Sequence, residues 1–148
     1  MRRLRKYLAL SLPERAIVLR SLLLLPMAAA RLRAQGMART TAWLGRLRPR
    51  VAHTAGTLSP QEVARLVNAA ASVVRARCLA RSLVLSHLLR NRGIPNEIQL
   101  GVSKSADGKL DAHAWVELDG VPLIDGADVS ALYAPLPAGA TQFRVDRS

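Results

Sequence analysis

The spacing of apolar residues changes once along the chain, at Gly93. Before this glycine, apolar residues recur every three or four positions, as on one side of a helix. After it, short apolar runs lie between turn residues, as in β-strands. Helices followed by strands predict an α+β fold in which the helices pack on an antiparallel sheet. With 148 residues, 50% of them apolar and 3% aromatic, the chain can bury one core built mainly from Leu, Val and Ala.

Two helices are expected in the middle of the chain. The first has Ser59 as its N-cap, Pro60 as its first residue and Glu62 as the partner in a capping box. The second begins at or near Cys78 and stops at Gly93, which suits the left-handed position after a helix. Because this second helix is apolar on almost every side, it belongs at the centre of the domain.

The remaining segments are interpreted from the same signals. A basic helix opens at Ser11, Pro26 kinks or divides it, and Gly36 ends it; a short helix and a linker at residues 49–56 follow. Beyond Gly93 a turn is expected at Asp107–Gly108. Four strands are expected, at residues 94–102, 112–118, 121–125 and 143–145.

Charge is distributed unevenly along the chain. The net charge is +12, of which residues 1–50 carry +11, residues 51–92 carry +5 and residues 93–148 carry −4. Such a basic region suits nucleic acid, an anionic membrane surface or an acidic polypeptide. Nucleic acid is the least suitable partner, because almost no aromatic residues could stack on bases and no nucleic-acid motif is present.

The apolar run SLLLLPMAAA, Ser21–Ala30, needs its own explanation. Ten residues are too few to cross a bilayer. The run faintly resembles a signal peptide, but charged residues interrupt the approach to it and Pro26 breaks it. A helix buried against the rest of the domain is favoured, with an amphipathic helix on a membrane surface as the alternative.

Cys78 is the only cysteine, so no intramolecular disulfide can form and a reducing cytoplasm is the default compartment. A helix start places the thiol beside unpaired backbone N–H groups and the positive end of the helix dipole. Arg75, Arg77 and Arg81 add positive charge, which favours the nucleophilic thiolate. A lone cysteine is also commonly a small buried residue, so Cys78 alone does not decide between the two roles.

Three histidines could serve as the base for this thiol. His53 lies in the linker and is expected at the surface. His87 follows Cys78 by nine residues on the same helix, which puts it half a turn off and about 13 Å along the axis, out of reach. His113 lies on a strand between two alanines, whose small side chains leave room for a helix end to approach the imidazole.

Asp125 could orient His113, but only in one register of the hairpin between them. With a two-residue loop at Asp119–Gly120, Asp125 would point to the other side of the sheet. A three-residue loop beginning at Leu118 shifts the pairing by one residue and places Asp125 directly opposite His113, with Cβ atoms about 5 Å apart. We therefore predict the three-residue loop.

These residues form a Cys-His-Asp arrangement. In it, the Cys78 thiolate attacks a carbonyl carbon, His113 protonates the leaving amine and Asp125 holds the imidazole tautomer. The backbone N–H of Cys78 is a natural donor to the oxyanion, whereas a second donor is not evident in the sequence.

The segments around these residues resemble the transglutaminase-like core: RCLARSLVLSHLLRNRGIPNEIQLGV, then AHAWVEL, then LID. Within that superfamily the chain is most similar to the C-terminal protease domain of the lasso-peptide B proteins, the leader peptidases of microcin-type lasso peptides. The resemblance covers about residues 76–125, with weaker agreement over residues 8–47. It implies a transglutaminase-like or papain-like cysteine protease fold with Cys78, His113 and Asp125 as the catalytic triad.

The resemblance also implies a function. A cysteine endopeptidase of this kind removes the leader from a ribosomally made lasso-peptide precursor, before a macrolactam cyclase closes the ring. Fused members begin with a leader-recognition domain, whereas here a basic helical region, residues 1–56, is expected to pack on a catalytic core, residues 57–148. This organisation resembles the split form, in which a separate leader-recognition protein delivers the precursor peptide.

Other interpretations remain open. The same triad suits an acyl transferase or amidase. The positive charge also suits a non-catalytic module that binds a membrane or an acidic peptide. The basic helices would dock the recognition protein, the leader or a membrane transporter, or would only form a solvated surface. A cytoplasmic location is expected, with peripheral contact to the inner face of the membrane as an extension. Because the sequence has no phosphate-binding loop, no nucleotide site is expected. No other cofactor and no metal ion are expected.

Overall fold

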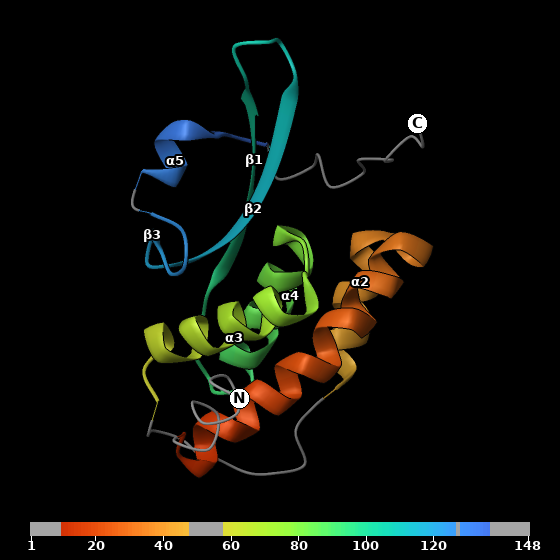
Figure 1. Cartoon of the computed structure of the whole chain (residues 1–148), viewed down its shortest axis with the longest axis vertical. Coiled ribbons are helices and arrows are strands. Elements are labelled where there is room, and N and C mark those ends of the chain that lie inside the picture. Colours follow the sequence, from red (N-terminus) through yellow and green to blue (C-terminus); the bar gives the residue numbers. More distant parts are fainter. Residues whose placement is uncertain (1–9, 48–57, 127, 137–148) are drawn as a thin grey trace.

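The computed structural model describes residues 10–47, 58–126 and 128–136 and shows helices beside an antiparallel sheet (Figure 1). The helices α2 (Leu12–Arg46), α3 (Pro60–Val74) and α4 (Cys78–Arg90) come first. They are followed by the strands β1 (Glu97–Lys104), β2 (Leu110–Leu118), β3 (Val121–Pro122) and β4 (Ala134–Pro135), with the short helix α5 (Val129–Leu132) before β4. The sheet order is β3-β2-β1-β4, and each neighbouring pair is antiparallel. The predicted α+β fold is confirmed.

Helix α3 begins at the predicted capping box. The Ser59 hydroxyl accepts a hydrogen bond from the Glu62 N–H at 3.2 Å, and the Glu62 carboxylate accepts one from the Ser59 N–H at 2.7 Å. The helix ends at Arg75, which adopts left-handed backbone angles (φ 52°), and only residues 75–77 separate it from α4. This tight connection fixes where α4, and with it Cys78, begins.

Helix α4 lies at the centre of the molecule, as its sequence predicts. It contacts α2, α3, β1 and β2. The Gly93 N–H donates to the Arg90 carbonyl and the Ile94 N–H to the Leu89 carbonyl, at 3.0 and 3.1 Å, with Gly93 left-handed as predicted. Its buried residues are Ala80, Ser82, Leu83, Val84, Leu85, Ser86, Leu88 and Leu89. Burying each leucine contributes about 1.5–3 kcal/mol, so this helix anchors the fold.

Helix α2 joins the two helices predicted in this region into one element with a break. It runs through Pro26 without leaving helical angles, so the predicted division at this proline is wrong. Pro26 is exposed, and water can bind the carbonyl of Leu22 that loses its partner. The break falls at Gly36 (φ 77°, ψ −179°), where we expected the first helix to end, and the short helix that we expected next follows within the same element.

The hairpin between β2 and β3 differs from the prediction. Leu118 pairs with Val121, so the loop contains two residues, Asp119 and Gly120, and the predicted three-residue loop is wrong. Both residues have positive φ (51° and 77°), which is the backbone of a type I′ turn that suits Asp-Gly and the twist of a hairpin. Strand β3 is also shorter than predicted, although the Leu123 N–H beyond it still donates to the Val116 carbonyl at 3.0 Å.

The last described segment returns to the sheet in a way that the sequence did not suggest. After α5, strand β4 pairs with β1, with Pro135 beside Gly101 and Ala134 beside Val102. The strand expected at residues 143–145 and the linker expected at residues 49–56 lie outside the described residues.

Candidate active site

Cys78 is the first residue of α4, as predicted, and its side chain is half-buried. The preceding residue, Arg77, is extended (φ −73°, ψ 160°) and its side chain makes no capping hydrogen bond. The N–H groups of the first turn of α4 are therefore not occupied by an N-cap side chain. Together with the helix dipole they favour negative charge at this end of the helix.

A buried hydrogen bond fixes the beginning of α4 against the sheet. The hydroxyl of Ser82, four residues after Cys78, donates to the carbonyl of Ala114 at 2.9 Å. Both residues are buried. Since Ala114 follows His113 in β2, this bond sets the first turns of α4 beside the strand that carries the histidine.

His113 and Asp125 form the central polar contact of the site. Nε2 of His113 lies 3.0 Å from Oδ1 of Asp125, and the two side chains are 21% and 17% exposed. A carboxylate only accepts hydrogen bonds, so Nε2 donates and, in the neutral imidazole, Nδ1 is left as the acceptor. Nδ1 is then the atom that could take a proton from a thiol.

Asp125 reaches His113 by another route than strand register. The chain follows the ladder only as far as Leu123, whose N–H donates to the Val116 carbonyl at 3.0 Å. Asp125 is then held from the helix side, because Nη2 of Arg81 donates to both of its carboxylate oxygens at 3.1 Å. The register argument for Asp125 is therefore wrong, although the contact that it was meant to explain is present.

Arg81 links the sheet to two helices. Besides Asp125, it donates from Nη1 to Oδ1 of Asn68 in α3 at 3.1 Å, and its side chain is only 16% exposed. The sequence analysis assigned Arg81 to the positive surroundings of Cys78 and missed this pairing. The available signal was its position three residues after Cys78, which places both side chains on one side of α4.

Two aromatic side chains flank the imidazole. The ring of Tyr133 lies 5.1 Å from that of His113, and the ring of Trp115 lies 6.1 Å from it in a nearly parallel arrangement. Gly101, opposite His113 in β1, makes room for them: a Cβ there would lie 2.7 Å from the Cβ of Tyr133. Sequence analysis included Trp115 in the AHAWVEL strand, two residues after His113, but it missed Tyr133.

The neighbours of Tyr133 raise its pKa. Its hydroxyl donates to Asp111 at 2.8 Å, and this hydrogen bond is the main reason that the pKa of Tyr133 is raised. The negative charges of Cys78 and Asp125 raise the pKa of Tyr133 further. Tyr133 therefore lies within electrostatic range of both Cys78 and Asp125.

The three predicted site residues are therefore brought together to different degrees. His113 and Asp125 are directly hydrogen bonded. Within the described ranges, no hydrogen bond joins the Cys78 thiol to either of them. Hydrogen bonds of this kind are often long before substrate binds, so the arrangement is compatible with a thiol that approaches Nδ1 on binding.

The family of the chain follows from its comparison with known proteins. The family model of the transglutaminase-like superfamily matches residues 15–138, most of the chain. The chain belongs to the transglutaminase-like superfamily. Searches of curated proteins and of solved structures each give no significant match. Membership indicates a fold of the cysteine-protease and acyl-transferase type, and all of α2 from Arg15 onward lies inside the matched region.

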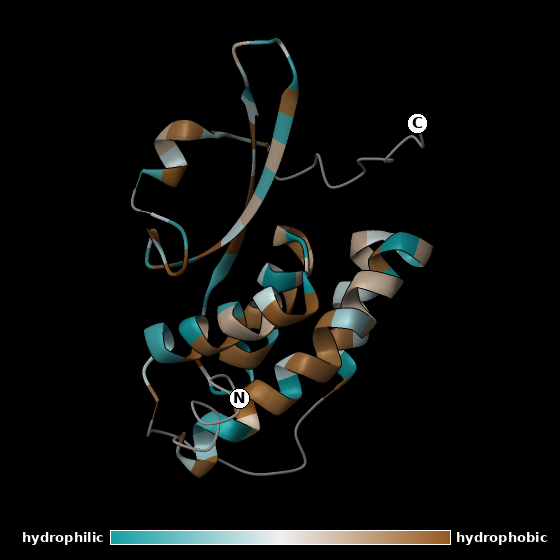
Figure 2. Cartoon of the chain, in the orientation of Figure 1, coloured by the Kyte–Doolittle hydropathy of each residue, from teal (hydrophilic) through white to brown (hydrophobic). Residues whose placement is uncertain are grey.

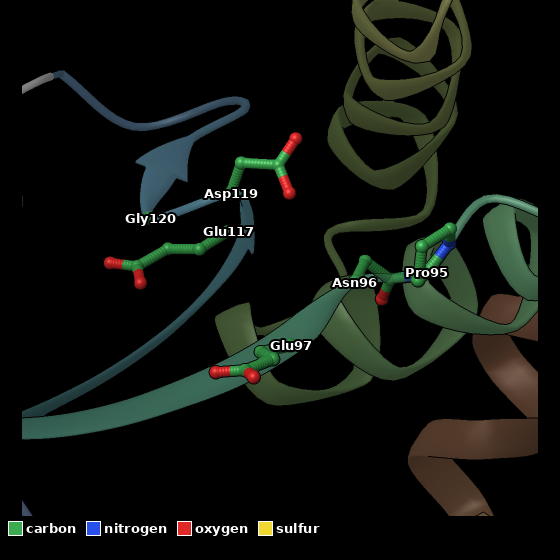
Figure 3. Close-up of a pocket in the computed structure, with 6 residues that line it drawn as sticks. All are labelled: Pro95, Asn96, Glu97, Glu117, Asp119 and Gly120. Carbon is green, nitrogen blue, oxygen red and sulfur yellow. The ribbon is translucent and has the colours of Figure 1, made fainter.

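Two pockets lie near the sheet of this transglutaminase-like domain, and neither is lined by Cys78 or Asp125. One, of about 240 Å³, lies where β1 begins and β2 ends (Figure 3). It is lined by Pro95, Asn96, Glu97, Glu117, Asp119 and Gly120. Three of these residues are acidic, and Glu97 and Glu117 are directly paired across the two strands, so the pocket is lined by negative charge.

The other pocket shares two residues with the surroundings of His113. It has a volume of about 330 Å³, and its lining includes Trp115 and Tyr133, the two rings that flank the imidazole.

The other candidate base and a metal site can be assessed directly. His87 accepts or donates a hydrogen bond with Asn91 at 2.9 Å, and burial, followed by the charge of Arg20, lowers its pKa. His53 lies outside the described residues. In the part of the chain that the structure describes, no three His, Cys, Asp or Glu side chains are grouped to hold a metal ion.

Proposed function

We propose that the chain is a cysteine peptidase that removes the leader peptide from a ribosomally made lasso-peptide precursor. The observation that carries the proposal is the 3.0 Å contact between His113 and Asp125 beside a helix that begins with Cys78. The superfamily supports the chemistry of a nucleophilic thiol. The resemblance of the HAW strand and the Cys78 helix to lasso-peptide B proteins supports the choice of substrate.

The reaction would proceed through a thioester. The Cys78 thiolate attacks the carbonyl carbon of the scissile peptide bond, and the backbone N–H of Cys78 donates to the oxyanion. The C–N bond breaks as His113 gives its proton to the leaving amine of the core peptide. Water then attacks the thioester, His113 accepts the proton of that water, and the leader leaves with a free carboxylate.

Asp125 has a positioning role in this mechanism. By accepting from Nε2, its carboxylate keeps Nδ1 directed at the thiol and stabilises the imidazolium. In the same scheme, a separate leader-recognition protein would present the precursor peptide. The macrolactam cyclase and a membrane transporter are further candidate partners.

A second function uses the same residues. If an amine rather than water attacks the thioester, the enzyme is an acyl transferase, and superfamily membership includes this type of chemistry. The products separate the two functions, because hydrolysis leaves a free carboxylate and transfer forms a new amide.

The test is a cleavage assay read by mass spectrometry. The protein is incubated with a candidate precursor peptide, with and without a leader-recognition protein. We expect the leader to be released with a free carboxylate, and Cys78→Ala and His113→Ala to abolish the release. His87→Ala is the matched control. His87 lies in α4 and has no part in the mechanism, so this variant should cleave the precursor normally. Cleavage by Cys78→Ala at the wild-type rate would overturn the proposal.

A further inference from the structure

The first half of α2, before the break at Gly36, exposes a row of large apolar residues. Leu12, Leu19, Leu23 and Met27 are 80%, 52%, 66% and 49% exposed. Ala16, Pro26 and Ala30 are exposed as well. At about 100° per residue, all seven lie along one side of the helix. We call these seven residues the outer stripe.

The outer stripe is not needed for the core. The residues of α2 that are buried are on the opposite side of the helix, about 180° away, where α2 packs against α3 and α4. In this first half they are Ile17, Ser21, Leu25 and Ala28. In Figure 2, hydrophobic residues recur along the whole first half of α2, as expected for a helix that is apolar on two opposite sides. Exposed apolar residues aligned in this way, rather than scattered, indicate a binding surface.

Positive charge borders the outer stripe on both sides. Arg20 lies on one flank and Arg33 on the other, and both are exposed. The only acidic residue of α2, Glu14, belongs to the capping box with Ser11 and has Arg65 at 3.7 Å. Arginines at these positions can lay their apolar stems along the stripe and extend their guanidinium groups sideways to anionic groups.

The composition of the outer stripe favours lipid over protein. Strong protein interfaces are rich in Trp and Tyr at their centres, whereas Leu12–Gln35 contains no aromatic residue. Aliphatic side chains flanked by arginines are the pattern of a helix that lies in the surface of an anionic membrane. Among the described residues, no helix has the length and apolar character to cross a bilayer, so contact would be along the helix.

We propose that the outer stripe of α2 docks the protein onto an anionic lipid bilayer, with the helix lying along the surface. The leucines and Met27 would enter the boundary between headgroups and acyl chains, and Arg20 and Arg33 would bind lipid phosphates. This surface is separate from the residues assigned to cleavage, so the inference stands or fails apart from the proposed function.

The test is co-sedimentation with vesicles of phosphatidylcholine with and without phosphatidylglycerol. We expect binding to the anionic vesicles that weakens as salt is added. Leu19→Ser/Leu23→Ser should weaken this binding at least about tenfold, because two partly exposed leucines lose their burial in lipid. Arg20→Gln/Arg33→Gln should weaken it on anionic vesicles. The matched control is Val121→Ser/Leu132→Ser, which removes two equally exposed residues from the sheet side and should bind as wild type.

Three outcomes would overturn the proposal. They are failure of the wild type to bind anionic vesicles at low salt, equal binding to neutral vesicles, and binding that survives both stripe and arginine substitutions. Loss of association of the stripe variant with a leader-recognition protein, with vesicle binding retained, would identify a protein interface instead. Circular dichroism confirms that each variant is folded, and its cleavage of a soluble precursor is expected to match that of the wild type.

Discussion

The helix that carries Cys78 and the segment that carries Asp125 are held in place by different forces. Helix α4 is surrounded by apolar side chains and is anchored by burial. The segment with Asp125 leaves the sheet after Leu123 and is held by hydrogen bonds of half-buried polar groups, those to Arg81 and His113. Burial makes the position of Cys78 part of global stability. The polar contacts make the position of Asp125 a local property that can be lost while the domain stays folded.

The largest effect is expected from a substitution in the polar segment that carries Asp125. Asp125→Asn keeps the shape of the side chain but removes its charge, so the His113 tautomer and the imidazolium lose their support. We expect precursor cleavage to fall roughly 10³-fold or more. The free energy of unfolding should fall by only about 1–3 kcal/mol, since the new amide oxygen can still accept one hydrogen bond from Arg81. Steady-state kinetics and urea denaturation measure the two quantities.

Asp128→Asn is the matched control for Asp125→Asn. Asp128 is an exposed aspartate three residues further along, and its substitution should leave cleavage and stability unchanged. A fall in stability of Asp125→Asn that accounts for its whole loss of activity would contradict the separation of the two sides.

A substitution in the core of α4 should show the opposite behaviour, with a large loss of stability and little change in turnover. Leu85 is fully buried in α4, and Leu85→Ala should lower the free energy of unfolding by about 2–5 kcal/mol, through lost burial and a cavity. The turnover of the protein that remains folded should change little, because no polar contact of the site is removed. Val73→Ala on the exposed side of α3 is the control and should stay within about 0.5 kcal/mol of wild type. A wild-type urea midpoint for Leu85→Ala would show that α4 is not the anchor.

The same difference explains what could be predicted from the sequence. Three features depend on residues a few positions apart, and all three were predicted. They are the capping box of α3, the start of α4 at Cys78 and the left-handed Gly93 just after α4. The route to Asp125 depends on Arg81, 44 residues earlier in the sequence, and no local pattern encodes it. We expected strand register to place Asp125 opposite His113, which required a three-residue loop. The chain leaves the strand ladder before Asp125, so register does not determine its position.

Substitution of Arg81 tests how α4 is coupled to the segment that carries Asp125. Arg81→Met removes both hydrogen bonds to Asp125 and the one to Asn68, so Asp125 should turn away from His113 in part of the molecules. We expect kcat for cleavage to fall about 100-fold with little change in KM, because substrate contacts are not altered. Arg81→Lys keeps the charge but not the paired geometry and should recover about tenfold of this loss.

The control for Arg81 is Arg65→Met, which removes an exposed arginine of α3 and should cleave as wild type. An increase in KM with kcat unchanged would show that Arg81 binds substrate instead of positioning Asp125.

The smallest effect concerns the capping box of α3, and it depends on pH. The hydrogen bonds from the backbone and then the hydroxyl of Ser59 lower the pKa of Glu62 below its usual 4.5. A pKa that is lower in the folded state stabilises the fold above the unfolded value, and this contribution is lost as pH falls through the folded value. Glu62→Gln should therefore melt below wild type at neutral pH, and the two melting curves should converge in strong acid. Gln61→Ala, beside it on the same exposed turn, should differ from wild type by the same amount at every pH. If the difference for Glu62→Gln also stays constant, the capping box acts through its shape alone, and α3 is positioned by burial without help from charge.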